Sequence, residues 1–341
     1  MQLTDFDYEL PDELIAQEPA AKRDQSRLMV VHKKDKNIEH QQFTDLLKYL
    51  RSGDVLVMND TKVIPARIYG IKISTGAKIE VLLLRQVAEN CWEVLVKPGK
   101  KARVEERLDF GAGQMQGKIL DYTDAGGRVI EFSCREPFLQ VLERIGAMPL
   151  PPYIKKPLVD QQRYQTVYAR QEGSAAAPTA GLHFTPELLA EVKSLGVKIA
   201  YVLLHVGLGT FRPVQVEDVT RHTMHQEYYE ITDRSAEEIN RAKASGGRVI
   251  AVGTTSVRCL ETSSNEQGQV LAGSGMTEIF IYPGYSFKVI DGLITNFHLP
   301  KSTLLMLVSA LAGREKVLEA YHRAVEEKYR FFSFGDAMLI I

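Results

Sequence analysis

The feature of this sequence that most constrains its fold is a run of short apolar segments between Gly53 and Ser133. Each segment is rich in β-branched and aromatic residues and is bounded by turn-forming residues, a pattern typical of strands. The expected strands are residues 54–58, 66–73, 78–84, 92–97 and 128–133. Several short strands at nearly even spacing predict a small barrel or sandwich. We place this β-rich unit at residues 63–150, because Pro149, Pro151 and Pro152 make a stiff exit.

The sequence on either side of this unit alternates between helical and strand patterns. Helical periodicity is present at residues 43–50, 186–195, 236–244 and 301–329, and strands are expected at 197–206 and 248–252. Strands that follow helices predict an α/β layer. A chain of 341 residues is long enough for two domains. The predicted fold class is a mixed α/β main domain, residues 1–62 and 151–341, with an inserted smaller β-barrel domain, residues 63–150.

Charge and composition exclude several classes of protein. A formal net charge of −1 lacks the basic excess of general nucleic-acid binders, so any RNA contact must depend on local basic patches. Three cysteines without a close pair indicate neither a disulfide framework nor a cysteine zinc site. The most apolar stretch, residues 304–312, is about half of what a bilayer span needs. The amino terminus lacks the layout of a secretion signal. We therefore expect a cytoplasmic protein without membrane contact.

Residues 174–186 combine small side chains with the expected start of a helix. Small residues let a backbone approach a ligand closely, and Thr185 is placed to cap a helix that Pro186 opens. Two interpretations stay open. Either a ligand lies on this helix start, or the small residues pack against a sheet and His183 is a buried core histidine.

Residues 205–211 contain a Gly-x-Gly, Gly207 and Gly209, directly after an expected strand. A dinucleotide-binding fingerprint needs its third glycine where Arg212 stands, and Pro213 argues against a helix in that first turn. The two glycines therefore indicate a tight turn beside a ligand pocket, or a loop without a ligand.

Residues 222–227 hold two histidines and a carboxylate. His222, His225 and Glu227 could be ligands of zinc or iron. In a strand His225 and Glu227 share a face, whereas in a helix His222 and His225 do. We favour a histidine oriented by a carboxylate, an acid/base arrangement, over a metal site. Polar surface residues near a sheet edge remain the alternative.

The apolar strand at 248–252 runs into Gly253, three hydroxyl residues and Arg258. Backbone amides and hydroxyls there could hold a phosphate or the carboxylate of an amino acid, with Arg258 as the forked partner. The Gly-Lys-Ser/Thr ending of a P-loop is absent, so hydrolysis of a nucleoside triphosphate is unsupported.

Three more segments carry polar residues at the ends of expected elements. Residues 294–303 contain His298 and precede a helix that Ser302 or Thr303 should cap, and an ordinary capping turn is the alternative. Residues 59–67 could be a hinge or a binding loop. A basic run near Trp92 suits a phosphate backbone and a stacked base, although a solvated hairpin is the default interpretation. The basic run consists of Lys97, Lys100, Lys101 and Arg103.

Taken in order, six segments resemble the signature of the S-adenosylmethionine:tRNA ribosyltransferase-isomerase family of queuosine biosynthesis. They are residues 59–67, 177–185, 205–211, 222–227, 253–258 and 295–303, and residues 6–11 and 331–338 extend the resemblance to both ends. Each segment alone is weak evidence, but the ordered set is specific. The resemblance implies an α/β domain with a smaller β-barrel domain, and a monomer.

The resemblance also implies a reaction. The ribosyl part of S-adenosylmethionine is transferred to the aminomethyl group of 7-aminomethyl-7-deazaguanine at the tRNA wobble position and rearranged to give epoxyqueuosine, while adenine and methionine leave. No cofactor is implied, because S-adenosylmethionine is consumed as a co-substrate. A base must remove a proton beside the sulfonium, an acid must protonate adenine, and the RNA amine must attack in its neutral form.

The same resemblance indicates which residues to expect at the site. For proton transfer we expect His225 with Glu227, and the further candidates are His183, His205 and His298. Arg258 is expected to hold the methionine carboxylate. The substrate-binding candidates as a group are Asp60, Arg67, Thr179, Gly181, Gly207, Gly209, Thr254, Thr255, Ser256, Arg258 and Asn296. The candidates for tRNA contact are Lys97, Lys100, Lys101 and Arg103, and no metal is expected.

Three rival functions share some of these features. An S-adenosylmethionine-dependent RNA methyltransferase would use both substrates but keep adenine attached to ribose. A zinc hydrolase would use His222, His225 and Glu227. A non-catalytic RNA-binding module would depend on the barrel alone, and the many polar segments outside the barrel count against it.

Overall fold

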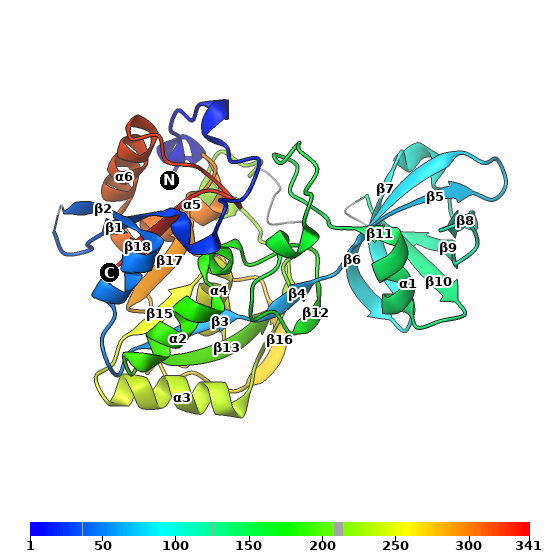
Figure 1. Cartoon of the computed structure of the whole chain (residues 1–341). Coiled ribbons are helices and arrows are strands. Elements are labelled where there is room, and N and C mark those ends of the chain that lie inside the picture. Colours follow the sequence, from blue (N-terminus) through cyan, green and yellow to red (C-terminus); the bar gives the residue numbers. More distant parts are fainter. Residues whose placement is uncertain (36, 124–125, 208–213) are drawn as a thin grey trace.

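The computed structural model describes residues 1–35, 37–123, 126–207 and 214–341. It has a large α/β body and a smaller barrel, which lie apart and are joined by a narrow connection (Figure 1). The predicted fold class is therefore confirmed. In these ranges no helix is both long and apolar enough to cross a membrane.

A mixed sheet forms the middle of the large body, and within the described residues it has nine strands in the order β16-β14-β13-β3-β15-β17-β18-β1-β2. The parallel centre consists of β13 (Lys198–Leu204), β3 (Val55–Asn59), β15 (Val249–Val252) and β17 (Gly292–Asn296). The outer strands are β14 (Glu227–Ile231), β16 (Gly273–Thr277), β18 (Ala337–Ile340), β1 (Arg27–Val31) and β2 (Ile38–Gln42).

Helices cover both faces of this sheet, because successive side chains of a strand point to opposite sides. In β3, Val55 and Val57 belong to one core cluster and Leu56 and Met58 to the other. The first cluster contains residues of α3 (Asp233–Ala244), α4 (Thr254–Thr262), α5 (Thr303–Ala312) and α6 (Arg314–Glu326). The second contains residues of α2 (Pro186–Ser194) and of the 3-10 helix η4 (Phe43–Tyr49).

Local signals explain where these helices begin and end. Thr185 caps α2 by accepting a hydrogen bond of 3.1 Å from the Leu188 amide, and Ser302 caps α5 in the same way. The single helix expected at 301–329 is wrong, because Gly313 has a φ of +90° and separates α5 from α6. The helix expected at 43–50 is a 3-10 helix.

The smaller body is a closed antiparallel barrel. Its strands follow the order β5 (Arg67–Lys72), β6 (Lys78–Ala88), β7 (Cys91–Lys97), β10 (Arg128–Cys134), β9 (Met115–Tyr122) and β8 (Arg107–Phe110), and β8 pairs back with β5. Strand β11 (Gly146–Ala147) adds to β5, and α1 (Phe138–Ile145) packs Val141 and Leu142 into the barrel core. The sequence analysis missed β8, β9 and α1.

Two short paired strands lie where the chain passes between the bodies. The chain leaves the large body through β4 (Thr61–Val63), and residues 148–164 bring it back to pack beside Val63. Strand β12 (Gln171–Ser174) then pairs with β4 in parallel. Val63 packs with Tyr164 and Ala177 of the large body, whereas Ile64 belongs to the barrel core. The domain boundaries at 63 and 150 stay a prediction.

Candidate active site

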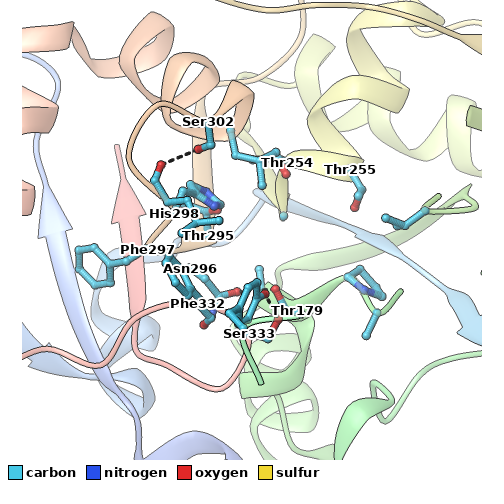
Figure 2. Close-up of a pocket in the computed structure, with 18 residues that line it drawn as sticks. Thr179, Thr254, Thr255, Thr295, Asn296, Phe297, His298, Ser302, Phe332 and Ser333 are labelled. Carbon is cyan, nitrogen blue, oxygen red and sulfur yellow. Dashed lines mark hydrogen bonds between the residues drawn. The ribbon is translucent and has the colours of Figure 1, made fainter. Parts of the chain in front are cut away.

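A cavity lies in the large body at the ends of the parallel strands β15 and β17 (Figure 2). The carboxyl edge of a parallel sheet is where α/β proteins bind ligands. We call this cavity the threonine pocket. Its lining comes from residues 153, 177–180, 206, 253–255, 295–299, 302, 304, 332 and 333.

The start of α4 gives the threonine pocket a place for an anion. Gly253, with a φ of +86°, turns the chain from β15 into this helix, and Thr254 and Thr255 line the pocket. The Thr255 hydroxyl is buried and makes no hydrogen bond to a described residue. The first amides of a helix have no partner inside the helix and attract negative charge. A carboxylate at this point would satisfy both groups.

Asn296 is fixed at the wall of the threonine pocket by three hydrogen bonds. Its Oδ1 accepts from the Thr179 hydroxyl at 2.9 Å, and its Nδ2 donates to the Phe332 carbonyl at 3.2 Å and to His183 Nε2 at 3.0 Å. His183 Nδ1 in turn lies 2.6 Å from the Ser26 hydroxyl. Burial lowers the pKa of His183 to about 3, so the ring is neutral. His183 is thus a core histidine that positions Asn296.

His298 also lines the threonine pocket in its neutral form. Burial lowers the pKa of this imidazole to about 3, and its Nε2 lies 2.8 Å from the Thr295 hydroxyl. Its backbone is held by Tyr8, which donates to the carbonyl at 2.5 Å, and by Tyr321, which accepts from the amide at 3.0 Å. The His298 ring is therefore neutral over the whole physiological pH range.

A second cavity lies between the barrel and the large body, and we call it the interdomain cleft. The barrel contributes residues of β6 and β7, and the large body contributes the ends of β12 and β13 and the start of β14. Its lining consists of residues 84–86, 92, 93 and 95 of the barrel and 172, 173, 205, 207, 225–228 and 276 of the large body.

Glu227 is a buried carboxylate at the cleft that three groups contact. Its Oε1 accepts from the Gly207 amide at 2.8 Å and lies 3.1 Å from His225 Nε2, and its Oε2 pairs with the Arg258 guanidinium. Burial opposes the charged form of Glu227, but Arg258 and His225 outweigh burial and hold its pKa below the usual value. An ionised carboxylate therefore orients the His225 ring toward the cleft.

His205 lies in the same cleft and is held from two sides. Its Nδ1 is 2.8 Å from the Thr61 hydroxyl, and its ring stacks on Tyr228 with 5.9 Å between centroids. Burial lowers the pKa of His205, and the nearby charge of Glu230 partly opposes this shift. Gly173 packs so closely that a Cβ at this position would lie 2.8 Å from His205 Nε2.

The threonine pocket and the interdomain cleft share one wall. Val206 lines the pocket, whereas its neighbours His205 and Gly207 line the cleft. The backbone here is fixed by hydrogen bonds from the Ala175 amide to the Val206 carbonyl and from the Val206 amide to the Ser174 hydroxyl. Molecules bound in the two cavities would therefore lie on either side of residues 205–207.

The model of the queuosine biosynthesis protein family matches residues 3–340. The chain belongs to this family. It is 77% identical to the S-adenosylmethionine:tRNA ribosyltransferase-isomerase of Desulforamulus reducens and 65% identical to that of Pelotomaculum thermopropionicum, in both cases over 100% of each chain. It also resembles the solved structure of S-adenosylmethionine tRNA ribosyltransferase from Thermotoga maritima, with 41% identity, a TM-score of 0.58, and coverage of 99% of this chain and 100% of that one.

Five of the six segments that carried the family resemblance contribute residues to the two cavities. The sixth, residues 59–67, contributes the Thr61 contact to His205. Of the substrate-binding candidates, those that line one of these two cavities are Thr179, Gly207, Thr254, Thr255 and Asn296. Gly209 lies outside the described residues.

Other candidates lie elsewhere. Arg258 pairs with the buried Glu227 and lines neither of these two cavities, and its expected contact with methionine stays a prediction. Ser256 donates to the Val252 carbonyl at 2.8 Å, and Gly181 is needed because a Cβ would lie 2.0 Å from the Tyr168 hydroxyl. Asp60 directly precedes β4 and borders a third groove with Arg170 and Tyr201, and burial raises its pKa to about 6. Arg67 pairs with Glu80 on the barrel.

The side chains of the basic run that the structure describes are exposed to solvent, and the histidine cluster does not form a metal site within the described residues. Lys97, Lys100 and Arg103 are exposed on the barrel, and the side chain of Lys101 lies outside the described part. Trp92 borders the interdomain cleft but is 5% exposed and stacks on Phe138, so it leaves little ring surface for a base. The His222 ring packs on Phe280, and within the described residues no group of His, Cys, Asp or Glu is arranged to hold a metal.

Several residues of the site escaped the sequence analysis. Thr61 and Gly173 fix His205, and Tyr153, Phe332 and Ser333 line the threonine pocket. Phe332 and Ser333 lie in the closing segment that supported the family resemblance, so their position in that segment was the available signal. Gly173, with a φ of +142°, gave no signal beyond being a glycine.

Proposed function

We propose that this chain transfers and isomerises the ribosyl moiety of S-adenosylmethionine onto 7-aminomethyl-7-deazaguanine at the tRNA wobble position, giving epoxyqueuosine. Adenine and methionine are the other products. The observation that carries this proposal is that the family segments gather around two cavities with a common wall. A reaction that joins S-adenosylmethionine to an RNA base needs two such adjoining sites.

S-adenosylmethionine binds in the threonine pocket. The methionine carboxylate lies at the start of α4, where the Thr255 hydroxyl lacks a partner among the described residues. Tyr153 and Phe332, whose ring centroids are 4.8 Å apart, supply an apolar surface for adenine. Asn296 supplies polar atoms that its three hydrogen bonds hold in place.

The deazaguanine base enters the interdomain cleft, and its aminomethyl group reaches the wall at Val206. His225 with the ionised Glu227 carries out proton transfer, and His205 and His298 are further candidates. The base removes a proton beside the sulfonium, the carbon–sulfur bond breaks to give methionine, and the glycosidic bond breaks as adenine takes up a proton. The neutral amine forms the new bond to the ribosyl group.

S-adenosylmethionine is the only small molecule that the reaction consumes, and no cofactor takes part. The protein acts as a monomer in the cytoplasm, where its tRNA substrate is found. Light scattering of the free protein should give the mass of one chain. Turnover should be unchanged by a chelator, because no metal cofactor is needed.

The test is to incubate the protein with S-adenosylmethionine and a tRNA that carries the deazaguanine amine, and to identify the nucleoside by mass. We expect a nucleoside heavier by the rearranged ribosyl group. A nucleoside heavier by one methyl group would identify a methyltransferase and reject the proposal, and an unchanged nucleoside would reject both enzymes.

A further inference from the structure

The outer face of barrel strands β5, β6 and β7 carries aromatic and cationic side chains in register. Tyr69 lies opposite Glu80, and Glu80 lies opposite Lys97. Opposed residues of antiparallel strands point to the same face, with Cβ atoms roughly 5 Å apart. The neighbours Ile68 and Val81 point inward and are fully buried. Tyr69, Glu80 and Lys97 therefore form one row across the outside of the barrel.

Tyr69 is unusually exposed for a large aromatic residue. Its side chain is 57% exposed, its ring stacks on no described aromatic ring, and its hydroxyl has no hydrogen-bond partner in the described ranges. Ile71 and Ile73 are 43% and 50% exposed, and Ile71 lies two residues from Tyr69 on the same face of β5. A grouped set of exposed apolar side chains marks a binding surface more often than a bare exterior.

The charges on this face leave a positive excess. Arg67 pairs with Glu80 at 3.4 Å, and Arg85 pairs with Glu93 at 3.2 Å, so both carboxylates are matched by an arginine. Lys97 is exposed and makes no ion pair with a described residue. A lysine without an ion pair, two strands or roughly 10 Å from an open aromatic ring, suits a chain of phosphates and bases.

The same face leads into the interdomain cleft. The next outward row, roughly 7 Å along the strands, consists of Arg67, Leu82 and Leu95, and Leu95 lines the cleft. Beyond it, Arg85 and Glu93 also line the cleft. A single-stranded segment whose one base occupies the cleft would therefore continue over Tyr69.

We propose that this barrel face binds the anticodon-loop nucleotides that flank the base held in the cleft. The Tyr69 ring stacks on an unpaired base, and Lys97 contacts a backbone phosphate. This inference rests on the proposed function for the identity of the RNA. Proteins recognise single-stranded RNA mainly by stacking splayed bases on aromatic rings, and Tyr69 is the ring that the face offers.

The test compares single variants in their affinity for the tRNA substrate, measured at several salt concentrations. Tyr69→Ala should weaken binding roughly 5- to 100-fold, as expected for one lost stacking contact. Tyr69→Phe keeps the ring and should bind like the parent. Lys97→Ala should reduce the slope of log affinity against log salt by about one. Binding of S-adenosylmethionine should be unchanged in all three.

Tyr122 provides the matched control. It is also an exposed barrel tyrosine, at 51%, but it lies on β9 with Arg128 4.3 Å above its ring, away from the β5–β7 face. Tyr122→Ala should bind tRNA like the parent. If Tyr69→Ala melts early, Tyr69→Leu keeps apolar bulk without the ring and gives the same comparison.

Parental tRNA affinity in Tyr69→Ala, or an equal loss in Tyr122→Ala, would overturn the proposed surface. The parent protein separates this outcome from a failure of the proposed function. If it releases no adenine from S-adenosylmethionine with the modified tRNA, the proposed function falls, while the tRNA affinities of the variants still decide whether the face binds RNA.

Discussion

Glu227 shows how a single residue can serve both stability and chemistry. Its carboxylate is buried between the Arg258 guanidinium, the Gly207 amide and His225. A buried carboxylate stays ionised only when charges or donors compensate for lost water. Arg258 supplies that charge, so the arginine acts on the site through Glu227. The cleft thereby keeps a fixed negative charge beside an imidazole.

Replacing Arg258 by Met should cost about 3–5 kcal/mol of unfolding free energy at pH 7, because a buried charge loses its partner. The folded-state pKa of Glu227 lies below its unfolded value, so its contribution is present above the unfolded pKa and is lost as the pH falls through the folded pKa. The penalty should therefore shrink in acid. Urea unfolding at pH 7 and at lower pH measures it. Arg85→Met, which breaks an exposed pair, should cost under about 1 kcal/mol, and an equal cost for both variants would contradict this view.

His225→Ala should lower turnover roughly 10²- to 10⁴-fold, as for a lost acid/base group, with S-adenosylmethionine affinity nearly unchanged. Glu227→Gln should also lower turnover, because a neutral amide holds the His225 ring less firmly than the carboxylate does and leaves Arg258 without a counter-charge. Pre-steady-state rates from pH 5 to 9 measure both effects. A rise or fall of the rate between pH 5 and 8 cannot come from the titration of His298, because burial lowers its pKa to about 3. If His225→Ala melts cooperatively and still has near-normal turnover, the acid/base role belongs to His205 or His298 instead.

At the scale of elements, the sequence predicted what local signals encode. The cap of α2 by Thr185 and that of α5 by Ser302 follow from side chains within three residues of their partners. Strand β9 was not predicted, because one of its inward-facing positions is Gly117 and not an apolar side chain. Ile130 and Phe110 pack so closely there that little room is left for a side chain. The contact of Thr61 with His205 joins residues that are 144 positions apart, so no local sequence pattern predicts it. The shared wall at Val206 depends on such long-range contacts.

Strand β12 sets the position of His205, and a substitution at Gly173 tests this. Gly173→Ala adds a Cβ 2.8 Å from His205 Nε2 and should lower turnover roughly 10- to 100-fold through a displaced ring. Gly284→Ala is the control, because Gly284 also has a positive φ, +105°, but nothing lies within 4 Å of its Cβ. Steady-state turnover of both variants is compared after their melting temperatures are matched. Equal losses would show that backbone strain alone accounts for the effect.

At the scale of the whole molecule, the two bodies divide the work. The barrel core is built only from residues between Ile64 and Ile145, and the two main core clusters of the large body contain none of them. No described residue of the barrel lines the threonine pocket. The interdomain cleft is the place where both bodies contribute side chains.

A chain in which a short Gly-Ser linker replaces residues 64–147 should therefore fold and bind S-adenosylmethionine, but should not modify tRNA. The two ends of the linker would lie close together, because Met148 packs against the cluster that contains Val63. Calorimetry and ligand titration measure folding and binding. Loss of cooperative unfolding or of S-adenosylmethionine binding would show that the large body depends on the barrel, and would contradict the boundaries placed at 63 and 150.

The central claim is that S-adenosylmethionine and the RNA base react across the wall at Val206. A crystal structure with a non-reactive S-adenosylmethionine analogue tests it most directly. We expect the analogue in the threonine pocket, with its carboxylate at the start of α4 beside Thr255 and its ribose against Val206. An analogue bound in the groove beside Asp60 and Tyr201, or wholly within the interdomain cleft, would contradict the claim.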